Sequence, residues 1–205
     1  HTITYGFDLH TAPTLTEKKI AREKLCADLG IQQDHRLLFF NGTLDYGPNR
    51  NALDIILTHL LPLLEKSNLP YAFIICGKNL PASYDELKAY RNRNVWYAGF
   101  VDDISVYFKG ADLFINPVTD GGGIKTKLVE ALGYDLSCVS TVSGAIGVPV
   151  EVTNQKLVIK KDGDWEGFVQ AILHGFQGNE KIDDLFFHHF QWNNIAEKAV
   201  NALIV

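Results

Sequence analysis

The chain has 205 residues, of which 46% are hydrophobic and 21% are charged, and its formal net charge is −5 at pH 7. This composition is typical of a globular protein with a sizeable core, and the acidic balance argues against a nucleic-acid partner. We expect no transmembrane segment, because no apolar run reaches the roughly 18 residues of a membrane helix, and we recognise no signal peptide. Cys26, Cys76 and Cys138 are isolated and lack metal-ligand spacing. Cys76 and Cys138 lie in apolar, strand-like runs and predict buried thiols in a reducing, cytoplasmic compartment, with peripheral membrane association left open.

Helical and strand-like patterns alternate along the chain. The first helix is predicted over 16–29 and ends at Gly30, a typical C-cap residue. An apolar helical stripe covers 53–64, where Pro62 is expected to cause a kink. Continuous apolar runs predict six strands buried on both faces, at 36–41, 71–76, 95–97, 113–116, 136–140 and 157–159. Further helices are predicted over 84–90 and 124–132, and two more between 181 and 204. Asp102 or Asp103 is expected to cap a helix that runs through Lys109, and Asp164 is expected to cap a helix over 165–176.

Short connections between alternating strands and helices are typical of an α/β fold with a doubly wound, Rossmann-like parallel sheet and helices on both faces. We assign residues 31–178 to this domain and residues 1–30 to an inter-domain linker segment and helix. Residues 179–205 are assigned to C-terminal helices that dock either back on this domain or on a domain outside this chain. In such a fold the ligand binds outside the carboxyl ends of the strands, near the reversal of strand order. The loops expected there are 42–49, 77–79, 99–101, 117–123 and 143–147.

A glycine-rich loop leads directly into a predicted helix between residues 120 and 132. Consecutive glycines let backbone N–H groups approach a ligand closely, and a helix N-terminus favours anions, so this corner suits a phosphate or diphosphate. At helical spacing Thr126, Lys127 and Glu130 share one face, where the Glu130 carboxylate could accept hydrogen bonds from sugar hydroxyls. A tight turn followed by a solvated helix face is the alternative, and the local pattern alone does not separate the two.

The motifs along nearly the whole chain are LLFFNGTLDYGPNRNALDIILTHLLPLL, AFIICGKNLP, NVWYAGFVDDISVYFKGADLFINPVTDGGGIKTKLVEALGYDLSCVST, SGAIGV and FQWNNIAEKAVNAL. In this order they resemble the C-terminal, nucleotide-sugar-binding half of a GT-B-fold retaining glycosyltransferase of the family four group (glycosyl transferases group 1). The most specific motif is the glycine loop followed by K-x-K-x-x-E-A, and the last one resembles the family's crossover helix. The resemblance implies that the chain is one half of a GT-B fold.

The resemblance also implies an activity and a site. The enzyme would move a sugar from a nucleoside diphosphate sugar to an acceptor, with retention and without a metal or other cofactor. The diphosphate would lie on the N–H groups around Ile124, and lysines would neutralise its charge as it leaves. Glu130 would bind the ribose, and the main chain of residues 99–101 would hold the nucleobase. An acceptor glycan or lipid-linked glycan would bind through an N-terminal domain outside this chain. The implied donor-binding residues are Gly42, Thr43, Gly77, Lys78, Phe100, Val101, Gly122, Gly123, Ile124, Lys125, Thr126, Lys127 and Glu130, and the catalytic residues stay unassigned.

The family pattern is incomplete in this chain. Glu130 matches the second carboxylate of the E-x7-E motif of the family, but Gly122 occupies the position of the first. Thr43 and residues 48–49 replace a basic pair that usually follows the first strand. One alternative is therefore a catalytically inactive, glycosyltransferase-like domain that binds nucleotide or acts as a scaffold. A GT-B-fold epimerase or phosphorylase is a third hypothesis.

Two other motifs have simpler interpretations. Asp162-Gly163-Asp164 has the D-x-D form of metal-dependent glycosyltransferases, but it precedes an amphipathic helix and predicts a turn with an N-cap. His188 and His189 are adjacent in a predicted helix, so they point to different faces and suit a metal poorly.

Overall fold

The computed structural model describes residues 5–174 and 181–203. Six strands form one parallel sheet in the order β3-β2-β1-β4-β5-β6. They are β1 (Arg36–Asn41), β2 (Tyr71–Cys76), β3 (Val95–Gly99), β4 (Leu113–Asn116), β5 (Cys138–Thr141) and β6 (Leu157–Lys160). All six predicted strands are confirmed, with ends that differ by at most two residues. The strand order reverses between β1 and β4, so a ligand crevice is expected where the loops after these two strands diverge.

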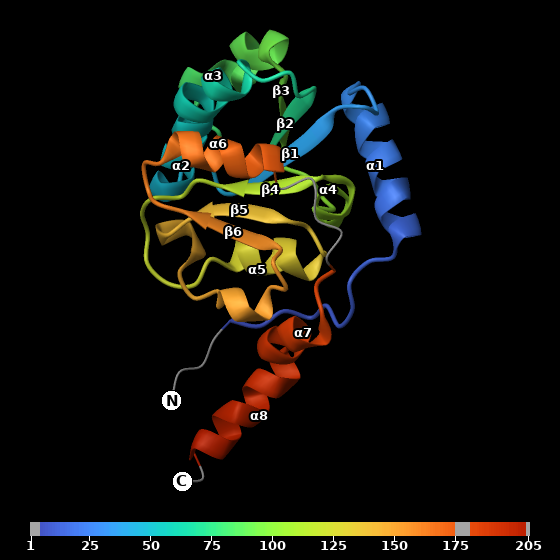
Figure 1. Ribbon diagram of the computed structural model, residues 1–205, viewed down its shortest axis with the longest axis vertical. Helices are drawn as coiled ribbons and strands as arrows, with labels where there is room; N and C mark the ends of the chain where they lie inside the picture. The colour runs from blue at the N-terminus through green and yellow to red at the C-terminus, as the bar shows by residue number, and fades with distance from the viewer. Residues whose placement is uncertain (1–4, 175–180, 204–205) are drawn as a thin grey trace.

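Helices cover both faces of the sheet, which confirms the predicted doubly wound α/β fold (Figure 1). Side chains alternate between the faces, so that Phe39 belongs to one buried cluster and Leu38 and Phe40 belong to the other. One face carries α2 (Gly47–Ile55), α3 (Leu61–Leu64) and α6 (Trp165–His174), and the other carries α1 (Leu15–Leu29), α4 (Ser105–Gly110) and α5 (Thr126–Gly133). Helix α7 (Asp184–Phe190) packs against α5, and α8 (Trp192–Leu203) points away from the body of the molecule (Figure 1).

The expected kink at Pro62 takes the form of a wider helical turn. A π-helical turn over Ile56–Leu60 joins α2 to α3, and the Leu61 N–H bonds to the Ile56 carbonyl five residues back. Proline has no N–H and its ring clashes with the carbonyl one turn before it, so widening the turn keeps the segment helical.

The prediction of a helix over 84–90 is wrong. Residues Ala82–Arg93 form 3-10 turns that are interrupted by Asp85, Glu86 and Leu87, whose φ angles are 43°, 51° and 58°. Left-handed backbone at non-glycine residues is locally unfavourable. Leu87 is only 1% exposed and packs in the core, so burial of this side chain offsets part of the local cost.

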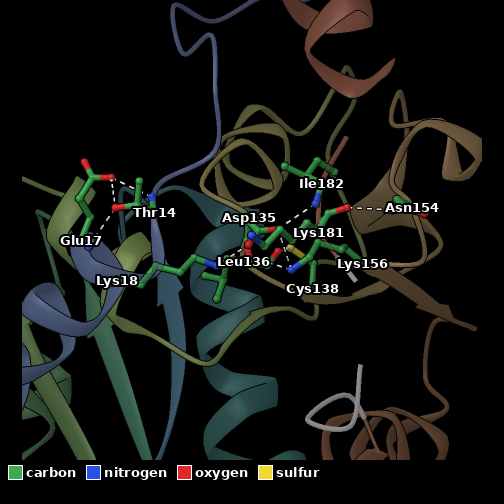
Figure 2. A network of polar contacts seen from close by, with 10 residues as sticks. All are labelled: Thr14, Glu17, Lys18, Asp135, Leu136, Cys138, Asn154, Lys156, Lys181 and Ile182. Atoms are coloured by element: carbon green, nitrogen blue, oxygen red, sulfur yellow. Dashed lines mark hydrogen bonds and ion pairs between the residues drawn. The ribbon is translucent and has the colours of Figure 1, made fainter. Parts of the chain in front are cut away.

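A buried ion network ties the early and late segments of the chain to the sheet (Figure 2). Asp135, just after α5, accepts hydrogen bonds from Nζ of Lys18 on α1 at 2.6 Å, from Nζ of Lys156 before β6 at 2.9 Å, and from the N–H of Ile182 before α7 at 2.8 Å. Burial acts to raise the pKa of Asp135, but these hydrogen bonds outweigh it and hold the pKa below its usual value. Lys18 and Ile182 thereby tie α1 and the segment before α7 to the central domain.

Cys76 and Cys138 are buried as predicted, and Cys26 is buried too. Asp164 caps α6 as expected, because it accepts the Gly167 N–H at 2.9 Å. The cap expected at Asp102 or Asp103 is wrong: the N-cap residue of α4 is Ile104, and Asp103, one position earlier, accepts the Ser105 N–H at 2.9 Å. Within the two described ranges, no helix is long and apolar enough to cross a membrane.

Candidate functional site

Two adjoining cavities open at the carboxyl ends of the central strands. The first, which we call the glycine-loop cavity, has a volume of about 400 Å³ and lies between the loops that follow β1 and β4. Its lining residues are Asn41, Gly42, Tyr46, Pro48, Asn49, Val118, Gly121, Gly122, Ile124, Lys125, Thr126, Lys127 and Glu130. It lies where the strand order reverses, as the fold predicts.

The second cavity, which we call the β2–β3 cavity, also measures about 400 Å³ and lies at the ends of β1, β2 and β3. Its lining residues are Asn41, Gly42, Thr43, Cys76, Gly77, Lys78, Phe100, Val101, Asp102 and Ile104. Asn41 and Gly42 line both cavities, so the two cavities adjoin each other. Among the predicted site residues, all of which the structure describes, Gly123 alone lines neither cavity.

Glycine at positions 42 and 77 lets the backbone form the floor between the cavities. A Cβ atom on Gly77 would lie 1.9 Å from the Gly42 carbonyl oxygen. The Gly42 N–H bonds to the Cys76 carbonyl at 3.1 Å, and the Gly77 N–H bonds to the Gly99 carbonyl at 2.8 Å. Sheet-like hydrogen bonding thus continues past the strand ends, and the absence of a side chain at position 77 lets the two loops approach each other this closely.

The helix after the glycine loop begins at Thr126, so the predicted start at Ile124 is two residues too early. Gly121 and Gly123 have left-handed φ angles of 91° and 71°, which favour glycine. The Lys125 ammonium turns back and donates to the Gly121 carbonyl, and burial lowers the pKa of Lys125. In the first helical turn the N–H groups of Leu128 and Val129 bond to the Lys125 carbonyl at 2.9 and 3.3 Å. The N–H groups of Thr126 and Lys127 have no partner within the helix.

Lys127 crosses from α5 to the loop that follows β1. Its Nζ donates to Oδ1 of Asn49 at 2.8 Å and to the Asn41 carbonyl at 3.3 Å, and it lies 4.4 Å from the centre of the Phe40 ring. Burial of the ammonium, and to a smaller extent the charge of the nearby Lys125, lower the pKa of Lys127 to about 7. The Lys127 amine therefore lies beside the loop after β1, although the sequence has no basic pair there.

Glu130 lies one turn further along α5 and lines the same cavity as Thr126 and Lys127, which confirms the predicted shared face. The opposite side of the helix is buried through Leu128 and Leu132. Burial raises the pKa of the Glu130 carboxyl, and a hydrogen bond that the Tyr5 hydroxyl donates to Oε1 at 3.3 Å offsets part of this rise.

Sequence reasoning missed Asn41, Asn49 and Tyr5. A polar residue at the end of an otherwise apolar strand was the available signal for Asn41, whose Oδ1 is buried and has no hydrogen-bond partner among the described residues. Asn49 was visible only as part of a turn-rich loop. Tyr5 is 125 residues away from Glu130 in the sequence, and no local pattern connects them.

The two cavities together combine groups whose chemistry suits a nucleoside diphosphate. A helix N-terminus and two ammonium groups suit the phosphates, a carboxylate suits vicinal hydroxyls, and exposed main chain near Phe100 can pair with a base edge. Among the described residues, no three His, Cys, Asp or Glu side chains gather into a group that could bind a metal ion.

The sequence profile described as Glycosyl transferases group 1 matches residues 35–177. The chain belongs to this family. Among curated protein sequences, none matches the chain. The family profile covers the whole sheet and both cavities but not the described C-terminal helices α7 and α8.

Solved structures share the fold of this glycosyltransferase domain. TarM is 14% identical with a TM-score of 0.72 over 98% of this chain and 38% of its own. WaaG, a glycosyltransferase involved in lipopolysaccharide biosynthesis, is 16% identical with a TM-score of 0.66, and the match covers 96% of this chain and 50% of WaaG. Anabaena HepE in complex with UDP-glucose is 17% identical with a TM-score of 0.69, and the match covers 97% of this chain and 56% of HepE. The chain therefore spans about half the length of these proteins or less, and the likeness confirms the GT-B domain fold.

Proposed function

We propose that this chain is the donor-binding domain of a retaining glycosyltransferase that moves a sugar from a nucleoside diphosphate sugar to an acceptor without a metal ion. The observation that carries the proposal is the junction of the two cavities at Asn41 and Gly42. One cavity offers groups for a diphosphate and a ribose, and the other offers main chain for a base. The complex of HepE with UDP-glucose supports this class of ligand.

Each part of the donor has a proposed partner. The diphosphate would lie at the first turn of α5, with Lys125 and Lys127 neutralising its charge in place of a metal. The ribose hydroxyls would donate to Glu130, and the base would lie along the main chain of Phe100 and Val101. The acceptor, a glycan or a lipid-linked glycan, would bind between this domain and a second one, since the similar structures are about twice as long.

The second candidate function is a nucleotide-binding domain without catalysis. Its support is Gly122, which replaces a carboxylate of the family motif and has open space where a side chain would point. The two candidates share the donor pocket and differ in turnover. Transfer of sugar from a nucleotide sugar by the full-length protein would favour the enzyme, and binding without transfer or hydrolysis would favour the second function.

A calorimetric titration of the 205-residue chain with UDP, GDP and ADP tests the donor pocket. We expect saturable binding of one diphosphate, equal with and without Mg²⁺. Glu130→Gln should weaken it about tenfold or more, because hydrogen bonds to a charged group are lost. Glu23→Gln, at an exposed glutamate on α1, is the matched control and should bind like the wild type. Absence of binding by all three nucleotides, or full affinity in Glu130→Gln, would contradict the proposal.

A further inference from the structure

The N-terminal segment runs between α5 and the corner that joins α7 to α8. The Phe7 N–H donates to the Phe190 carbonyl at 3.0 Å, and the Phe7 ring lies 5.9 Å from the Phe186 ring, centre to centre. On the α5 side, a Cβ atom on Gly133 would lie only 2.2 Å from the Phe7 ring. Glycine at position 133 therefore lets this segment lie directly on the helix that carries Glu130.

Tyr5 is held at both ends within this arrangement. Its hydroxyl donates to Oε1 of Glu130 at 3.3 Å, and its ring packs edge-on against Trp192 at the start of α8, 5.9 Å away. Gly6 allows the close approach, since a Cβ atom there would lie 2.7 Å from Trp192. The hydrogen bond between Tyr5 and Glu130, which are 125 positions apart in the sequence, thus depends on the position of α8.

We propose that Tyr5 is a positioning residue for the nucleotide site, which orients the Glu130 carboxylate for the ribose and is itself held in place by Trp192. The inference rests on the proposed function, because Glu130 matters here as the ribose ligand. It adds that donor affinity is coupled to the C-terminal helix: a shift of the α7–α8 corner moves Trp192, and with it the hydrogen bond to Glu130.

The electrostatics of the pair agree with this role. Burial raises the pKa of Glu130, and the Tyr5 hydrogen bond works in the opposite direction by favouring the carboxylate. Three kinds of titratable group surround the pair. Tyr134 lies just after α5, and burial, followed by the charges of Asp103 and Glu130, raises its pKa. Asp8 acts on Tyr5, and Lys125 and Lys127 line the same cavity as Glu130. Loss of the Tyr5 hydroxyl should therefore leave a carboxyl group that ionises less readily.

Two measurements on Tyr5→Phe test the inference. The first follows the Glu130 side-chain carboxyl by carbon-13 NMR in the ligand-free chain, where we expect its titration midpoint to rise by about half a unit to one unit. The second is UDP affinity by calorimetry between pH 5 and 7, which should fall about threefold to tenfold and begin its acid-side loss at higher pH. Trp192→Leu, which keeps the hydroxyl, should move both readouts in the same direction. Tyr84→Phe is the matched control, because Tyr84 donates to Asp54 at 2.6 Å outside both cavities.

The outcomes separate the two proposals. The role of Tyr5 would be overturned if Tyr5→Phe leaves the titration midpoint of Glu130 unchanged, whichever nucleotide the chain binds. The melting temperature of the variant shows that it is folded. UDP binding that needs Glu130 but is equal in Tyr5→Phe and wild type would overturn the role of Tyr5 as well, while the proposed function stands. Failure of the wild type to bind UDP, GDP or ADP would instead overturn the proposed function and this inference with it.

Discussion

Lys127 leads to a prediction in which the pH dependence of nucleotide binding identifies one residue. Its pKa is about 7 in the free protein because the ammonium is enclosed by Asn41, Asn49 and the Phe40 ring. A bound diphosphate would place negative charge beside this ammonium and return its pKa to about 10, close to the value of an ordinary lysine. The protein should therefore take up a proton as it binds a diphosphate at or above pH 7.

The size of the effect follows from linkage. With a pKa of about 7 in the free protein and about 10 in the complex, affinity falls about fivefold from pH 7 to pH 8 and about fiftyfold from pH 7 to pH 9. Uptake on binding is about half a proton at pH 7 and about 0.9 at pH 9 by the same relation. Below about pH 6 the phosphate itself protonates and affinity should fall again.

Calorimetry in two buffers with different ionisation enthalpies measures the protons taken up. Lys127→Arg should flatten the profile between pH 7 and 9, because arginine stays charged throughout this range. Lys78→Arg, in the β2–β3 cavity, is the control and should keep the wild-type slope. A wild type that binds without proton uptake, or a Lys127→Arg variant with the wild-type slope, would refute the reasoning.

Three further predictions concern stability and the shape of the site. Asp135→Asn should lower the free energy of unfolding by about 3 kcal/mol, since it leaves two ammonium groups without their buried partner. The melting temperature should fall by about 6–12 °C. Asp28→Asn, in an exposed ion pair, is the control and should lower the free energy of unfolding by less than about 1 kcal/mol. Because the pKa of Asp135 is lowered on folding, this difference should be full above the unfolded pKa of about 3.9 and disappear as pH falls through the lower folded value. Gly77→Ala should destabilise the chain by about 1–3 kcal/mol and weaken UDP binding, because the methyl group would meet a backbone carbonyl, whereas Gly47→Ala, with open space around it, should do neither. Gly122→Glu should keep the melting temperature within about 2 °C and raise the affinity for a nucleotide sugar relative to the free diphosphate; an unchanged ratio of the two affinities would mean that a carboxylate at this position does not reach the sugar.

Much of the fold could be predicted because strands and helices have local signals. Apolar runs located all six strands, and the helical periodicity over 53–64 located the segment from the end of α2 through α3, although α2 itself begins at Gly47. The failures occurred where tertiary contacts oppose local preference. Leu87 takes a left-handed conformation in exchange for burial, which no periodicity reveals. The start of α5 was misplaced because the conformation of the glycine loop depends on contacts with the loop after β1.

The sequence by itself determined the strands, the glycine loop and the family, because these depend on neighbouring residues and on a shared order of motifs. The tertiary structure alone decided the strand order that places β1 beside β4 and so brings their loops to one crevice. It also decided that Lys127 replaces the missing basic pair by reaching across that crevice, and that Tyr5 contacts Glu130. Such contacts depend on the packing of segments far apart in the chain, and packing follows from the shape of the whole core rather than from any local pattern.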